Sequence, residues 1–242
     1  MRLVLLGPPG AGKGTQAKRL AAEHSLVQLS TGDMLRTAAQ AGSPVGLRIQ
    51  QMMARGELCP DDVVVEIVAD RIEQPDARNG FILDGFPRTL PQAQALDRML
   101  AEKGLQLDAV IEISVDESIL LDRINRRIAE MKGRGEALRE DDDPQVLQAR
   151  LMAYRAETAP LTAYYASRSA LRTINGMASV ADVAQEIEAT LRATPGQSER
   201  KEAGDGQAGP KRSGLHERPK VPPRPKQQVA QGSPGKRVPP KN

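Results

Sequence analysis

Leu-Val-Leu-Leu-Gly-Pro-Pro-Gly-Ala-Gly-Lys-Gly-Thr, residues 3–15, places a short apolar strand directly before a glycine-rich loop. We expect a helix to begin near Lys13. The four glycines let backbone N–H groups converge on a phosphate without Cβ clashes, and the helix N-terminus adds its positive dipole end. The Lys13 ammonium can reach the outer phosphates of a nucleotide. The stretch therefore predicts a phosphate-binding loop rather than an ordinary strand-turn-helix corner.

The residue after the lysine departs from the general form of this motif. A Ser or Thr hydroxyl usually follows the lysine and binds Mg²⁺, but here Gly14 stands in that place and Thr15 comes next. The loop therefore lacks the metal ligand that switch GTPases use. The ending Gly-Lys-Gly-Thr, preceded by Pro9-Gly10, resembles the nucleoside monophosphate kinases, and the adenylate kinases most of all.

Charge divides the chain near Thr194. Residues 1–193 carry 23 Lys and Arg and 27 Asp and Glu, a net charge of −4, whereas residues 194–242 carry 11 and 4, a net charge of +7. The C-terminal part also holds 9 of the 18 prolines and no aromatic residue. It offers too little apolar surface to offset the entropy lost on ordering. We predict a folded domain over residues 1–193 and a disordered basic tail over residues 194–242.

Cysteine usage and hydropathy indicate the compartment. Cys59 is the only cysteine, which excludes a disulfide within one chain and a cysteine-based zinc site. The apolar run Leu3–Leu6 is too short for the core of a signal peptide, and no stretch approaches the length of a membrane span. These features predict a soluble, cytoplasmic protein that does not associate with membranes.

Apolar strand-like runs alternate with helix-like stretches along residues 1–193. The five runs are Leu3–Leu6, Val27–Leu29, Phe81–Leu83, Val110–Ile113 and Leu171–Ile174. This alternation predicts an α/β fold of the P-loop NTPase type, a five-stranded parallel sheet with helices on both faces. Residues 32–74 contain no strand signal and are broken at residues 42–44 and 59–61. Because Ser43 suits a helix cap and Pro44 a first helical position, we expect a helical insertion here.

Residues 29–36 read Leu-Ser-Thr-Gly-Asp-Met-Leu-Arg and follow the second predicted strand at the carboxyl edge of the sheet, where ligands bind. Ser30 and Asp33 fit the start of a capped helix, which by itself would explain the segment. The run also resembles the AMP-site segment of adenylate kinases. That resemblance implies that Thr31 contacts the AMP base and Arg36 its phosphate. It further implies an AMP-binding insertion of about residues 30–59, in which Glu57, Leu58 and Cys59 close over the adenine.

Residues 84–88 read Asp-Gly-Phe-Pro-Arg, which matches the adenylate kinase signature without change. A carboxylate at a strand end can hold the water shell of Mg²⁺ beside the phosphate loop, so Asp84 is a candidate metal ligand through water. An aspartate that caps the next turn is the alternative. The resemblance implies that Arg88 binds the α-phosphate of AMP, that Gln92 reads the adenine edge, and that the rest of the segment lines the AMP site: Gly85, Phe86 and Pro87. A Gln amide can satisfy one donor and one acceptor of adenine together.

Asp116–Arg127 reads as a helix in which Arg123 and Arg127 lie one turn apart on one face. Such a face is often only solvated. By position in the family, however, these two arginines contact the ATP phosphates, and Arg139 and Arg150 contact the transferring phosphoryl group and AMP. The resemblance also implies a short lid over about residues 127–138, with Gly133 and Gly135 as hinges and without the zinc-binding cysteines of long-lid relatives. The remaining ATP-binding residues that it implies are Gly10, Ala11, Gly12, Lys13, Gly14, Thr15 and Ala178.

The resemblance implies a monomeric enzyme that catalyses MgATP + AMP ⇌ 2 ADP and serves nucleotide and energy-charge homeostasis. The sequence offers no plausible general base and needs none, because a phosphate monoester has a second pKa of about 6 and is mostly dianionic at neutral pH. The reaction needs Mg²⁺ and positive charge instead. The residues expected to act in catalysis are Lys13, Arg88, Arg123, Arg139 and Arg150.

Two other functions remain as alternatives for residues 1–193. UMP/CMP kinases are close relatives, but they tend to replace both Thr31 and Gln92, and both are present here. A switch or motor that hydrolyses ATP would need Ser or Thr at position 14 and a water-orienting glutamine, for which the sequence has no clear candidate. Three roles remain open for the tail. It could be a solvating segment without a partner, a basic segment that binds RNA, DNA or another anionic surface, or a segment that forms a polyproline II helix at Pro219–Pro225 for a partner groove.

Truncation of the chain after Arg192 is expected to leave melting temperature and kinase activity nearly unchanged, because the proposed motifs and strands all precede that residue. Loose contact of the basic tail with the acidic domain should fade as salt rises past about 0.15 M, where the Debye length is about 8 Å. The measurement compares full-length and truncated proteins at low and moderate salt. A drop of several degrees, or a tenfold loss of activity that persists at moderate salt, would contradict the domain boundary.

Overall fold

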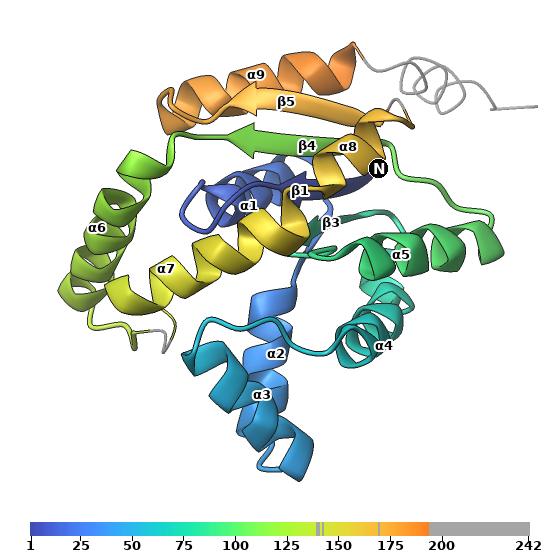
Figure 1. The fold of residues 1–242 in the computed structure, drawn as a ribbon. Helices are drawn as coiled ribbons and strands as arrows, with labels where there is room; N and C mark the ends of the chain where they lie inside the picture. Colours follow the sequence, from blue (N-terminus) through green and yellow to red (C-terminus); the bar gives the residue numbers. More distant parts are fainter. Residues whose placement is uncertain (139–140, 142, 169, 194–242) are drawn as a thin grey trace, which may run out of the picture. The chain divides into compact units, whose positions relative to one another are not determined.

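The computed structural model describes residues 1–138, 141, 143–168 and 170–193, all within one compact unit. One sheet contains β1 (Arg2–Leu6), β2 (Val27–Ser30), β3 (Phe81–Asp84), β4 (Ala109–Ser114) and β5 (Leu171–Asn175) in the order β2-β3-β1-β4-β5 (Figure 1). Every neighbouring pair is parallel. The predicted five-stranded parallel sheet is therefore confirmed, with each strand within about two residues of its apolar run.

Side chains of β1 alternate between two hydrophobic cores, as the period of a strand requires. Leu3 and Leu5 belong to one core, together with residues of α1 (Lys13–His24) and α9 (Val180–Arg192). Val4 and Leu6 belong to the other, with residues of α4 (Asp61–Ile72), α5 (Leu90–Glu102) and α8 (Leu161–Ala166). Both faces of the sheet are covered by helices, which explains why its strands read as continuous apolar runs.

The segment between β2 and β3 is helical, as predicted. It contains α2 (Thr31–Gln40), α3 (Pro44–Ala54), α4 and the 3₁₀ turn η1 (Pro75–Ala77). The Ser43 side chain accepts a hydrogen bond from Gly46 N at 3.0 Å, and Pro44 is the first helical residue. A Cβ at Gly46 would lie 2.6 Å from the Ala38 carbonyl oxygen. The α3 helix therefore packs directly against the backbone of α2.

The region after β4 departs from its predicted boundaries. A 3₁₀ turn, η2 (Glu117–Ile119), precedes α6 (Leu120–Gly133), which continues well beyond Arg127. Residues 129–132, Ala-Glu-Met-Lys, are strong helix formers and extend the helix into the predicted lid. Gly133 is thus the last helical residue, and Gly135 follows with a φ of 67°, a conformation that favours glycine.

Two short helical elements follow and lead to β5. They are α7 (Pro144–Ala153) and the π-helical turn η3 (Tyr154–Thr158), before α8. Among the described residues, no helix combines the length and apolar character that crossing a membrane requires. The predicted tail, residues 194–242, lies outside the described residues.

Replacement of Gly80 by alanine should destabilise the protein more than replacement of Gly104. Both glycines have positive φ, 134° and 63°, but a Cβ at Gly80 would lie 2.2 Å from the Met1 carbonyl oxygen, whereas a Cβ at Gly104 would meet nothing within 4 Å. Gly104→Ala carries only the conformational cost, about 1–2 kcal/mol. Gly80→Ala adds a backbone clash, for which we expect about 2 kcal/mol more. Urea unfolding of both variants measures the difference, and equal losses would contradict the steric argument.

Candidate active site

A cavity of about 860 Å³ opens at the carboxyl edge of the sheet. Its wall draws on every segment that the sequence marks for nucleotide binding: the loop after β1, the helical insertion, the segment after β3, the α6 and α7 helices, and the loop before α9. Ligands of open α/β sheets bind at this edge. The cavity is therefore the candidate active site.

The phosphate loop reaches the cavity in the expected conformation. Gly7 has a φ of 138°, and a Cβ there would lie 2.6 Å from the Ile113 carbonyl oxygen, so only glycine lets the loop pass this close to β4. The α1 helix begins at Lys13 after Gly12, and neither a side-chain cap nor an acidic residue occupies its first turn. The N–H groups of that turn remain available to an anion.

Lys13 lies among like charges in the cavity. Its Nζ donates hydrogen bonds to the carbonyl oxygens of Gly7 at 2.7 Å and Pro8 at 2.9 Å. Burial lowers the pKa of the Lys13 ammonium to about 8, with Asp84 opposing this shift and Arg88 adding to it. A phosphate placed beside Lys13 would favour the charged form of the side chain.

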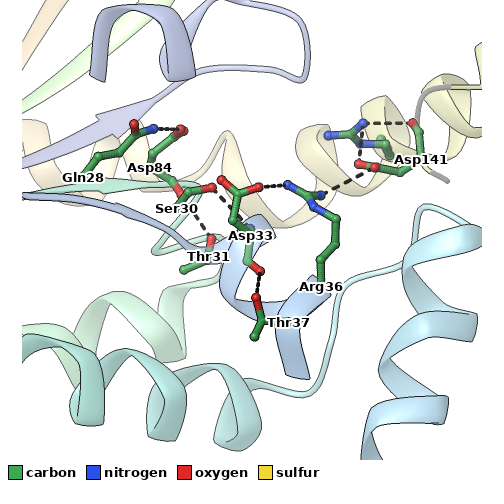
Figure 2. Close-up of polar contacts among 9 residues, drawn as sticks. Gln28, Ser30, Thr31, Asp33, Arg36, Thr37, Asp84 and Asp141 are labelled. Atoms are coloured by element: carbon green, nitrogen blue, oxygen red, sulfur yellow. Dashed lines mark hydrogen bonds and ion pairs between the residues drawn. The ribbon is translucent and has the colours of Figure 1, made fainter. Parts of the chain in front are cut away.

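Asp84, the last residue of β3, faces the phosphate loop. A Cβ at Gly14 would lie 3.3 Å from Asp84 Oδ2, so a Ser or Thr at position 14 would crowd the carboxylate. Gln28 Nε2, from β2, donates to the same oxygen at 3.0 Å (Figure 2). Carboxylate oxygen suits Mg²⁺, and no group of three or more His, Cys, Asp or Glu among the described residues could hold a metal by itself. The chemistry thus fits one carboxylate acting beside a nucleotide and water.

Arg36 lies between two carboxylates, as Figure 2 shows. It donates to Asp33 Oδ1, one turn earlier on α2, and its Nη1 lies 3.6 Å from Asp141 Oδ1. Arg150 Nη1, from α7, lies 3.0 Å from Asp141 Oδ2 and donates to the Asp141 carbonyl oxygen at 3.2 Å. The Asp141 side chain is only 12% exposed. One carboxylate thus joins two arginines from distant parts of the chain.

The insertion and α7 meet at Gly56, which precedes Glu57, Leu58 and Cys59 on the cavity wall. Gly56 has a φ of 73°, and a Cβ there would lie 3.0 Å from both Arg150 Cγ and the Val146 carbonyl oxygen. Burial raises the pKa of the Cys59 thiol, and Arg88 opposes that shift.

Arg88 is fixed by three hydrogen bonds. Its Nε donates to the Gly85 carbonyl oxygen at 2.8 Å, and its backbone N–H donates to Gln92 Oε1 at 2.8 Å. Its carbonyl oxygen accepts from Thr158 Oγ1 at 2.8 Å. Burial lowers the pKa of the Arg88 guanidinium, and Asp84 and Asp141 oppose that shift. The guanidinium is thereby aimed at the cavity from a rigid turn.

Two side chains tie the loop before α9 to the phosphate loop and α1. Arg123 donates to the carbonyl oxygens of Ala11 at 3.3 Å and Gly176 at 2.7 Å. Gln16 Nε2 donates to the Val180 carbonyl oxygen at 2.9 Å. Ala178, in the loop between these attachments, lines the cavity. The segment predicted to contact the ATP base is thus held against the predicted phosphate site.

The structure brings nearly all predicted site residues to one cavity. Those that line the cavity are Gly10, Ala11, Gly12, Lys13, Gly14, Thr15, Thr31, Arg36, Glu57, Leu58, Cys59, Asp84, Gly85, Arg88, Gln92, Arg123, Arg127, Arg150 and Ala178. Phe86 differs, because its side chain is fully buried in a hydrophobic core. Pro87 lines a smaller adjoining cavity of about 60 Å³. Arg139 lies outside the described residues.

Sequence reasoning missed four polar residues of the site: Gln16, Gln28, Asp33 as a partner of Arg36, and Asp141. Two of these residues left a local signal. Asp33 precedes Arg36 by three residues on one helix, a spacing at which opposite charges meet. Gln28 left the other signal. It stands two residues before Ser30, so both side chains point to the same face of β2. The partners of Gln16 and Asp141 lie on other elements, and a local pattern does not indicate them.

Comparison with known proteins agrees with this site. The family model for adenylate kinase matches residues 5–170. The adenylate kinase of Nitrobacter hamburgensis is 57% identical over 206 residues, which cover 85% of this chain and 99% of that protein. The adenylate kinase of Parvibaculum lavamentivorans is 61% identical over 191 residues, covering 79% of this chain and 92% of that protein. The chain belongs to the adenylate kinase family.

Proposed function

We propose that this chain catalyses the reversible transfer of the ATP γ-phosphoryl group to AMP, giving two ADP, within the large cavity. The observation that carries the assignment is that cationic side chains from five separate segments line a single cavity: Lys13, Arg36, Arg88, Arg123, Arg127 and Arg150. Two polyanions must meet for this reaction, and fixed positive charge in a water-poor site stabilises the charge that spreads over the transferring group.

The donor nucleotide is proposed to bind at the phosphate loop. The N–H groups of residues 10–15 and the Lys13 ammonium would hold its phosphates, with Arg123 and Arg127 reaching over them from α6. The loop at Ala178 would contact the base. This placement is supported by the attachment of that loop to Ala11 through Arg123.

The acceptor AMP is proposed to bind between the insertion and α5. Arg36, Arg88, Arg139 and Arg150 would hold its phosphate, and Thr31 and Gln92 would read its base. The segments at residues 57–59 and 85–87 would complete the pocket. Asp33 and Asp141 support this assignment, because they keep Arg36 and Arg150 together at one place on the wall.

Mg²⁺ is proposed to enter with ATP, held by Asp84 through water. When bound, it would neutralise phosphate charge of the donor. The hydrogen bond from Gln28 supports this role, because it goes to Asp84 Oδ2 and leaves Oδ1 to accept from a water of the metal ion. We also propose that the enzyme needs no zinc.

Closure of the insertion and of residues 127–138 over the cavity is proposed to exclude water, which would otherwise take the phosphoryl group and waste ATP. We also propose that the enzyme is a monomer and that its folded domain ends at residue 193. For the tail, residues 194–242, we propose an anionic partner.

AMP should be the preferred phosphoryl acceptor by a wide margin over CMP, UMP and GMP. A site with placed polar groups rejects analogues that leave those groups unpaired. A coupled assay of ADP formation with each acceptor at fixed MgATP measures the preference. Equal or better turnover of CMP or UMP would favour the UMP/CMP kinase alternative.

Arg88→Ala should lower kcat by about 10²-fold or more, because it removes a phosphate contact that strengthens in the transition state. The matched control is Arg98→Ala, which removes an exposed arginine of α5 outside the cavity. Steady-state kinetics of both variants, with melting temperatures to check folding, provide the measurement. A kcat near that of the unmodified protein would rule out a role for Arg88 in the reaction.

A further inference from the structure

Gln92 is held by both ends of its carboxamide. Its Oε1 accepts from the backbone N–H of Arg88 at 2.8 Å, and its Nε2 donates to Asp61 Oδ1 at 2.7 Å. The side chain is only 1% exposed, yet it lies on the cavity wall. The two ends of a carboxamide have nearly the same shape, so only hydrogen-bond partners decide which end points where.

The two partners of Gln92 permit one orientation. A backbone N–H can only donate, and an ionised carboxylate can only accept. Rotating the amide by half a turn would set N–H against the Arg88 N–H and oxygen against the Asp61 carboxylate. In the observed orientation, one amide N–H and one oxygen lone pair remain for a ligand.

Asp61 is itself well placed for this task. The same Oδ1 accepts from Thr89 Oγ1 at 2.9 Å, and Thr89 Oγ1 caps α5 by accepting from the Gln92 backbone N–H at 3.3 Å. Asp61 is the first residue of α4, two residues after Cys59 on the cavity wall. Asp61 therefore joins the insertion to the start of α5, where Gln92 lies.

We propose that Asp61 is a positioning residue that fixes the polarity of the Gln92 amide and thereby selects 6-aminopurine over 6-oxopurine acceptors. The proposal rests on the proposed function, in which Gln92 reads the acceptor base. Adenine offers a 6-amino donor beside the N1 acceptor, which together match the lone pair and the N–H left on Gln92. A 6-oxopurine offers an acceptor at O6 beside a donor at N1, which reverses the pattern. A buried pair of mismatched polar groups is costly.

Loss of Asp61 leaves only the Arg88 N–H to orient the amide. Rotation of the amide toward a 6-oxopurine then costs the hydrogen bond from the Arg88 N–H and brings two donors together there, but it no longer sets an oxygen against a carboxylate. Selectivity between the two purine classes should fall before the enzyme loses phosphoryl transfer, because the Asp61 side chain accepts hydrogen bonds from Thr89 and Gln92 and from no arginine proposed to bind phosphate.

The test compares AMP and IMP as acceptors for Asp61→Ala and Asp61→Ser, with kcat and KM measured for AMP, IMP and ATP. Both variants should raise the KM for AMP about tenfold, leave the KM for ATP unchanged, and narrow the ratio of kcat/KM between AMP and IMP by tenfold or more. Asp61→Asn should recover most of the ratio, because its amide oxygen still accepts from Gln92. The matched control is Asp62→Ala, which removes the other, exposed carboxylate in the first turn of α4 and should keep the original ratio.

Gln92→Ala separates the two levels of the argument. If this change leaves both the KM for AMP and the AMP to IMP ratio unaltered, the proposed role of Gln92 fails. If it collapses the ratio while the folded Asp61 variants keep it, the inference about Asp61 is overturned and the proposed function stands.

A double-mutant cycle distinguishes positioning from general support of the fold. Asp61→Ala added to Gln92→Ala should change the ratio no further, since Asp61 acts through Gln92. Independent losses that multiply in the double variant would overturn the inference. Melting temperatures of all variants confirm that the comparison is made between folded proteins.

Discussion

Repulsion among the cations of the cavity is the constraint on which the rest of the site depends. The proposed reaction requires Lys13, Arg36, Arg88 and Arg150 to stand close enough to share phosphate groups, and like charges in a poorly hydrated cavity oppose one another. The structure answers with carboxylates placed between them. Asp84 favours the charged forms of Lys13 and Arg88, and Asp141 joins Arg36 to Arg150. Each carboxylate thus reduces the repulsion between neighbouring cations.

The register of the sheet fixes the positions of the segments that carry these charges. Leu5 of β1 pairs with Asp84 of β3, and Ser30 of β2 pairs with the same residue on its other side. The glycine-rich loop, Asp84 and the start of the insertion therefore leave adjacent strands at the same level. Both faces of these strands are buried, so a shift in register would misplace core residues as well as the site.

Local sequence patterns predicted the elements of the fold well because their causes are local. Ser43 and Pro44 start α3, and the apolar runs match the strands. The predicted end of α6 at Arg127 was wrong, because the strong helix formers at residues 129–132 continue the helix to Gly133. The motifs also predict most of the residues that line the cavity, because the spacing of each motif follows from the chemistry of phosphate binding.

The sequence did not indicate which hydrogen bonds hold these side chains in place. The hydrogen bonds between Gln28 and Asp84, Asp61 and Gln92, and Gln16 and Val180 span 56, 31 and 164 positions. Such pairs depend on tertiary packing.

The absence of a side chain at Gly56 lets the insertion and α7 come into direct contact. The backbone of the insertion lies directly on α7 there, since a Cβ at Gly56 would come within 3.0 Å of both the Val146 carbonyl oxygen and Arg150 Cγ. A larger residue at position 56 would push the insertion away from α7, so the missing side chain sets the distance between these two segments. The close packing of α3 on α2 has the same cause at Gly46, where a Cβ would lie 2.6 Å from the Ala38 carbonyl oxygen. The spacing of the insertion from α7 and the spacing of α3 from α2 thus each depend on a position that has no side chain.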